Sequence, residues 1–124
     1  MIREASRQEI DELLASRSIK HEGAIKCDCY VVEQGAYKML LAITPVSDQS
    51  CEVHITCPKE FVVRSRKLCQ ESFEWLASIG WQKCYTAIKE SQYKTAHNLC
   101  KRIGFAQVGC YNGHIVYERI LQCQ

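Results

Sequence analysis

The order of elements in residues 51–121 constrains the fold more than any other feature of this chain. A strand-like run at 51–57 leads through a basic turn at 64–67 into an amphipathic helix predicted over 66–78. Backbone N–H groups in the first turn of a helix have no partner inside that helix, and the turn before them supplies cations. The pattern therefore predicts a site for an anionic, phosphate-bearing ligand, with a solvated basic turn as the alternative.

A second strand, a second helix and a hairpin complete this half. Residues 84–89 read as a strand, and apolar residues at helical spacing predict a helix over 92–103 that ends at Gly104. Asn112-Gly113, between strand-like runs, is the strongest short hairpin signal that a sequence carries. The apolar face predicted for the helix comprises Ala96, Leu99, Cys100 and Ile103.

The chain begins with a short strand at 2–5 and a helix. Ser6 and Glu9 form a capping-box pattern, in which the Ser6 side chain accepts from the Glu9 backbone and the Glu9 side chain reaches back. An apolar stripe behind this pattern extends the predicted helix to Ser16.

The segment after this helix leads into a second hairpin. Residues 17–27 fit either a short helix or a loop, and strand-like runs at 29–33 and 37–45 predict an antiparallel pair. A chain of 124 residues is too short for two independent cores. The sequence therefore predicts one α+β (α/β) domain over 1–124, with helices on the faces of a sheet.

Composition limits the broad class of function. Sixteen basic and fourteen acidic residues give a net charge of +2, which is too small to indicate nucleic-acid binding. No apolar run approaches the roughly 18 residues of a membrane span, and the N-terminus lacks the residue order of a secretory signal. We therefore expect a cytoplasmic protein.

The nine cysteines predict neither disulfides nor a metal centre. Their number is odd, and most of them lie inside periodic patterns where small apolar residues fit. Cys27 and Cys29 form a lone Cys-x-Cys without a second pair at zinc-finger spacing. His97 and His114 also stand alone in the sequence, so we predict no functional role for them.

With these elements in place, the chain resembles the GNAT superfamily of N-acetyltransferases. Members begin with a strand and a helix like those predicted at 2–16, carry an acetyl-CoA loop after the fourth strand, and close the last helix with a pattern like Ala96-x-x-Leu99-x-x-x-x-Gly104-Phe105 before a final hairpin. The resemblance implies a mixed, largely antiparallel sheet flanked by helices and ending in a β-hairpin. It also implies direct transfer of an acetyl group from acetyl-CoA to an amine on a small molecule or a protein.

The family binds the pyrophosphate on a loop written Arg/Gln-x-x-Gly-x-Gly/Ala. Aligned on Arg64, the two small positions are Lys67 and Cys69 here, whose side chains should crowd the phosphates. Cations at Arg64, Arg66 and Lys67 should partly offset lost backbone contacts. The cofactor-binding residues that the resemblance implies are Val62, Val63, Arg64, Ser65, Arg66, Lys67, Leu68 and Cys69.

Amine acylation also needs a base, because an amine must lose its proton to become a nucleophile. Glu52 and His54 alternate with apolar residues, so both should point to one face of the strand, where the family frequently places a base. His54 is the first choice because it titrates in the useful range, and a solvated strand face is the alternative. Cys100 stands where the family often has the tyrosine that protonates the leaving thiolate, and Tyr117 is a reserve proton donor.

A second hypothesis follows from the same departures. The missing glycines and tyrosine and the short length resemble acetyltransferase-like proteins of bacteriophages, including small internal virion proteins. Such a protein would be catalytically degenerate, would reside in the virion, and would bind other virion proteins as an interaction module. Nucleic-acid binding through basic residues ranks last, because the aromatic residues are not interleaved with them, and the sequence favours no oligomeric state.

Overall fold

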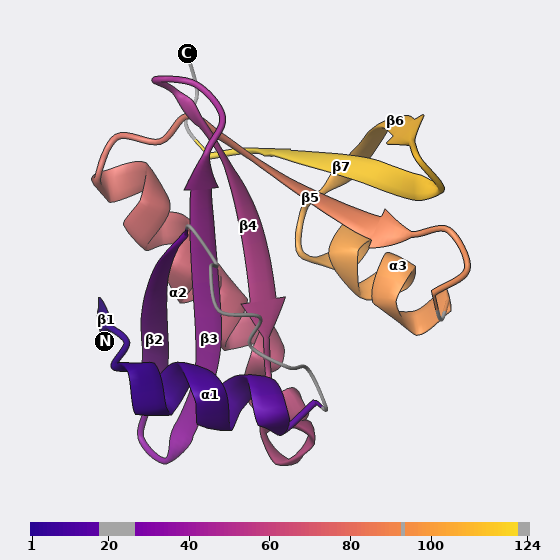
Figure 1. Cartoon of the computed structure of the whole chain (residues 1–124). Helices are drawn as coiled ribbons and strands as arrows, with labels where there is room; N and C mark the ends of the chain where they lie inside the picture. The colour runs from indigo at the N-terminus through magenta and orange to yellow at the C-terminus, as the bar shows by residue number, and fades with distance from the viewer. Residues whose placement is uncertain (18–26, 93, 122–124) are drawn as a thin grey trace.

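The computed structural model describes residues 1–17, 27–92 and 94–121 of the chain (Figure 1). The segment predicted as a helix or a loop over 17–27 lies outside the described residues except at its two ends. The elements follow in the order β1 (Ile2–Glu4), α1 (Arg7–Ala15), β2 (Asp28–Gln34), β3 (Tyr37–Pro45), β4 (Ser50–Thr56), the 3-10 helix η1 (Lys59–Arg64), α2 (Ser65–Ser78), β5 (Lys83–Lys89), α3 (Lys94–Arg102), β6 (Ala106–Tyr111) and β7 (His114–Ile120).

The strands form one sheet in the order β1-β2-β3-β4-β5-β7-β6. All described pairs are antiparallel except β4 with β5, which confirms the predicted mixed, largely antiparallel α+β fold with a C-terminal hairpin. Val31 and Val32 are adjacent on β2 and both fully buried, because one faces α1 and the other faces α2. The two helices therefore cover opposite faces of the sheet.

The sheet divides between β4 and β5. These strands pair at three positions only, the last being Glu52 with Tyr85, whereas β5 and β7 pair along seven positions. Beyond Glu52 and Tyr85 the two strands separate, as Figure 1 shows, and β5, β7 and β6 turn away from the N-terminal half. A single core cluster, which includes residues of α2 and of strands on both sides, joins the two halves.

Local sequence signals form as predicted in two places. The Ser6 and Glu9 capping box is complete: the Glu9 backbone N–H donates to Ser6 Oγ at 3.2 Å, and the Ser6 N–H donates to Glu9 Oε1 at 3.0 Å. Asn112 and Gly113 both have positive φ, at 48° and 74°, as a tight hairpin turn requires.

One face prediction is wrong. Cys100 is buried as expected, but Leu99 is 38% exposed on α3 and does not belong to the buried face. The helix spans Lys94–Arg102 and contacts the end of β5 and β7 through His97, with Cys100 as its buried residue.

The N-terminal strand is tied to α1 by an ion-pair network. Arg3 contacts Glu9 at 2.6 Å and Glu33 at 2.6 Å. The hydrogen bond from Arg3, followed by that from the Ser6 backbone, lowers the pKa of Glu9 to about 2. The folded protein therefore holds Glu9 ionised at a pH where the unfolded chain takes up a proton.

We expect Glu9→Gln to flatten the acid limb of the stability curve. A depressed pKa in the folded state gives stability that is present above the ordinary value of 4.5 and is lost as the pH falls toward about 2. The free energy of unfolding should therefore drop less between about pH 5.5 and about pH 3 in Glu9→Gln than in the wild type, as measured by urea denaturation. Asp11→Asn, which removes an exposed carboxylate from the same helix, is the control; acid limbs of equal slope in wild type and Glu9→Gln would contradict the expectation.

Candidate functional site

The predicted cofactor loop is helical throughout. The 3-10 helix η1 runs directly into α2, and the Ser65 N–H donates to the Val62 carbonyl. Inside an α-helix the N–H groups of Leu68 and Cys69 are used by the i−4 ladder. In the first turn of α2, the amides of Arg66 and Lys67 therefore lie outside this ladder, whereas the Ser65 amide already bonds to Val62.

The side chains of this segment divide into two groups. Val63, Arg66 and Lys67 are exposed, whereas Leu68 and Cys69 are buried in the core. The Cys69 side chain therefore points inward and does not crowd a phosphate group at the start of α2, although the sequence had led us to expect that it would. Two cations are left on the outer surface of the first turn of α2, where a helix end favours negative charge.

Arg64 is held differently from its neighbours. Its guanidinium carbon lies 5.0 Å from the centroid of the Tyr37 ring, in a cation–π contact with β3. This contact anchors the end of η1 against the sheet.

Glu52 and His54 lie on one face of β4, as the alternation predicts. His54 Nε2 is 2.7 Å from Glu52 Oε1, and their side chains are 56% and 39% exposed, respectively. Glu52 belongs to the last pair before β4 and β5 separate, so the two side chains stand where the sheet divides. Water and solutes reach both of them.

Two more polar side chains extend this row across the sheet. Glu52 pairs with Tyr85, and Tyr85 pairs with Glu118 on β7. Their neighbours Cys51 and Cys84 are fully buried toward α2, so the row lies on the opposite face. The hydrogen bond between Tyr85 and Glu118, more than burial, raises the pKa of the Tyr85 hydroxyl.

Sequence reasoning missed Tyr85 and Glu118. They come together with Glu52 only because β5 lies between β4 and β7 in the sheet. Strands β5 and β7 are neighbours although they are not consecutive along the chain. The sequence carried part of the signal, because both residues lie in predicted strands. The order and register of those strands, which bring the two residues beside Glu52, were not predicted.

Cys100 is not placed to donate a proton. Its side chain is 5% exposed in the core cluster, and burial raises the pKa of its thiol to about 12. A free thiol has a pKa of about 8.5, so transfer from Cys100 to a leaving thiolate is uphill. This cysteine behaves as a small apolar residue.

The buried Tyr117 and the half-buried His97 form a pair that the sequence did not indicate. His97 Nδ1 is 2.8 Å from the Tyr117 hydroxyl, and His97 Nε2 is 3.1 Å from the carbonyl of Lys89. A carbonyl only accepts, so Nε2–H donates to it, and in the neutral ring Nδ1 accepts the Tyr117 O–H. Tyr117 is 1% exposed and burial raises its pKa, while His97, for which no partner was predicted, has two.

The cysteines of the described residues are free thiols, with Cys27 Sγ and Cys29 Sγ 3.8 Å apart. Within residues 1–17, 27–92 and 94–121, no group of three or more His, Cys, Asp or Glu side chains is arranged to hold a metal ion. In the same part of the chain, no helix has the length and apolar character of a membrane span.

Several solved structures with the same arrangement are N-acetyltransferases. A spermidine N-acetyltransferase chimera from Vibrio cholerae and hSSAT superposes with a TM-score of 0.76 at 14% identity, covering 98% of this chain and 96% of that one. The ribosomal-protein-S18-alanine N-acetyltransferase of Escherichia coli gives 0.74 at 10% identity, covering 100% and 95%. A putative phosphinothricin N-acetyltransferase gives 0.68 at 14% identity, covering 98% of both chains.

These likenesses extend over the whole chain and establish its fold. No protein-family model matches the sequence, and no curated protein matches it. The chain has the GNAT fold of N-acetyltransferases, as the resemblance of its sequence predicts.

Proposed function

We propose that this protein is an acetyl-CoA-dependent N-acetyltransferase that moves an acetyl group directly to an amine. The observation that carries the proposal is the His54–Glu52 pair, 2.7 Å apart and accessible, at the point where β4 and β5 separate in a GNAT fold. In the His97–Tyr117 pair described above, by contrast, the Tyr117 side chain is buried.

In the proposed reaction His54 is the general base. Its imidazole takes a proton from the acceptor ammonium, which leaves the nitrogen lone pair free to attack a carbonyl carbon. The Glu52 carboxylate orients the ring through Nε2 and stabilises the imidazolium that forms. Acetyl-CoA would supply the acetyl thioester, whose C–S bond would break as the N–C bond forms, with CoA leaving as the thiolate.

The residues at the start of α2 fit a diphosphate by charge. Arg66 and Lys67 are exposed cations at a helix N-terminus, and their amides are outside the α-helical ladder. Of the cofactor segment 62–69, we assign phosphate contact to these two residues. Leu68 and Cys69 anchor the helix from the core side.

The acceptor in this proposal is an amine-bearing small molecule or protein. Two carboxylates, Glu52 and Glu118, flank Tyr85 on the exposed face of the sheet and suit a cationic group. Two of the similar structures are named for acceptors of this kind, which are spermidine and the alanine of a ribosomal protein. Cys100 and Tyr117 are left out of the proposed machinery because both are buried.

Calorimetric titration with acetyl-CoA tests the cofactor site. We expect binding in the wild type and a loss of about 10- to 100-fold in affinity for Arg66→Ala and for Lys67→Ala, since each removes one charge-assisted contact to phosphate. Arg7→Ala, which removes an exposed cation from α1, is the matched control and should bind like the wild type. Absence of heat at millimolar acetyl-CoA would defeat the proposal.

Two observations favour the alternative, a catalytically degenerate GNAT-fold protein of bacteriophage type that serves as an interaction module. The Ser65 amide is already satisfied by Val62, and Lys67 occupies the position of a family glycine. In that case Lys67→Gly should leave acetyl-CoA binding undetectable. Under the enzyme proposal the same change, which removes a cation and also bulk, should still allow binding.

A further inference from the structure

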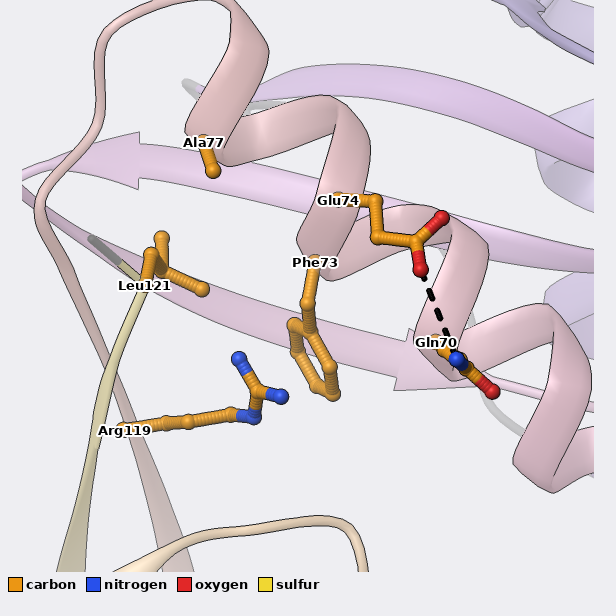
Figure 2. Close-up of a pocket in the computed structure, with 6 residues that line it drawn as sticks. All are labelled: Gln70, Phe73, Glu74, Ala77, Arg119 and Leu121. Atoms are coloured by element: carbon orange, nitrogen blue, oxygen red, sulfur yellow. Dashed lines mark hydrogen bonds between the residues drawn. The ribbon is translucent and has the colours of Figure 1, made fainter. Parts of the chain in front are cut away.

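A pocket of about 330 Å³ lies between α2 and the end of β7, on the face of the sheet that α2 covers (Figure 2). Arg119 lines it and alternates along β7 with Glu118, which belongs to the opposite face. The pocket is therefore separate from the His54–Glu52 site. Its lining residues are Gln70, Phe73, Glu74, Ala77, Arg119 and Leu121.

Two contacts fix the side chain of Arg119. Its Nε–H donates to the carbonyl of Ile103 at 2.9 Å, and its guanidinium carbon lies 4.4 Å from the centroid of the Phe73 ring. Gly104 leaves room for it, because a Cβ there would lie 2.8 Å from Arg119 Nε. The side chain is thus held through Nε and its plane, and the two terminal amino groups have no hydrogen bond to the described residues.

The charge of Arg119 is not neutralised within the described part of the chain, where it forms no ion pair. Glu74 lines the same pocket, but Figure 2 shows its carboxylate directed at Gln70, with which it forms a hydrogen bond of 3.4 Å. A fixed, half-buried guanidinium with free donors favours an anionic partner, and its planar fork matches a carboxylate.

We propose that this pocket binds the carboxylate of a small organic acid. The carboxylate accepts from the terminal amino groups of Arg119, and the apolar body of the ligand lies against Ala77 and Leu121. A phosphate dianion fits less well, because Arg119 is the single cation among the lining residues and Glu74 opposes a second negative charge. The ligand is either a plain acid or an amino acid whose ammonium group meets Glu74.

Three aromatic probes separate these cases: benzoate, L-phenylalanine, and phenethylamine, which lacks a carboxylate. In calorimetry with the full chain and no acetyl-CoA, we expect benzoate or L-phenylalanine to bind with a dissociation constant of about 1 mM or tighter. Phenethylamine should bind at least about tenfold more weakly. A preference for L-phenylalanine that Glu74→Gln removes identifies an amino acid, and equal binding of the two acids identifies a plain carboxylate.

Two variants keep the test independent of folding. Arg119→Gln removes the donors but also the contacts to Ile103 and Phe73, so it is paired with Ala77→Phe, which fills the half-exposed rim and leaves Arg119 intact. Both should abolish binding of the acids. Binding that survives in Ala77→Phe, equal binding of phenethylamine, or no binding of either acid to the wild type would each overturn the proposal. None of these outcomes depends on acetyl transfer.

Discussion

His54→Gln is expected to lower kcat for amine acetylation by about 10²–10⁴-fold, the usual contribution of a positioned general base. Glutamine keeps the approximate length of the side chain and its contact with Glu52, but it does not accept the proton of the acceptor ammonium. The affinity for acetyl-CoA should not change, because the proposed phosphate contacts lie at Arg66 and Lys67. Steady-state kinetics with the acceptor that the wild type acetylates, together with calorimetry for acetyl-CoA, measures both quantities.

Two further variants distinguish a base from a residue that merely supports the strand. Glu52→Gln should lower kcat less than His54→Gln, since it removes the group that orients the ring and leaves the base in place. His114→Gln, at the start of β7, should have no effect, because its ring bonds to the carbonyl of Asn112 on an exposed turn. Wild-type kcat in His54→Gln would refute the assignment of the base.

Local patterns in the sequence predicted much of the fold. The Ser6 and Glu9 capping box, the Asn112-Gly113 turn and the alternation at Glu52 and His54 each depend on residues no more than three positions apart. Such local preferences agree with the final fold, so the structures that they predict are present in it. The order of elements that they define was sufficient to indicate a GNAT fold.

The parts that were not predicted depend on contacts between distant segments. His97 bonds to Tyr117, twenty residues away, because α3 rests on β5 and β7. Tyr85 and Glu118 join Glu52 through the strand order, which no local pattern specifies. The exposure of Leu99 has the same origin, since helical spacing identifies an apolar face but not how much of it a partner covers.

The cofactor segment combines both kinds of information. The basic residues at 64–67 correctly predicted the start of a helix. The segment that leads into it is the 3-10 helix η1 and not an open loop. In α2, which follows η1 directly, Cys69 is buried in the core and Lys67 is exposed. Of the two glycine positions lost relative to the family pattern, Lys67 alone is therefore placed to affect a bound phosphate through its side chain.

Phe73→Ala is expected to lower the free energy of unfolding by about 3–5 kcal/mol, as is typical when a buried aromatic ring is removed. Phe73 is 2% exposed on α2, and its ring lies 5.6 Å from that of Phe105 and beneath the guanidinium of Arg119. Both partners belong to the half of the molecule beyond the β4–β5 division, where the strands share only three pairs. The ring is therefore part of what holds the two halves together.

Urea unfolding followed by far-UV circular dichroism and by tryptophan fluorescence measures this effect. In the wild type the two transitions should coincide, because one core cluster spans both halves and a shared core unfolds cooperatively. Phe73→Leu, which retains most of the apolar volume, should cost less than Phe73→Ala, and Val63→Ala, at a residue 84% exposed, should change stability by less than about 0.5 kcal/mol. If Phe73→Ala lost less than about 1 kcal/mol, the cavity argument would fail, and α2 would be coupled to the β5–β7–β6 half through other contacts of the cluster.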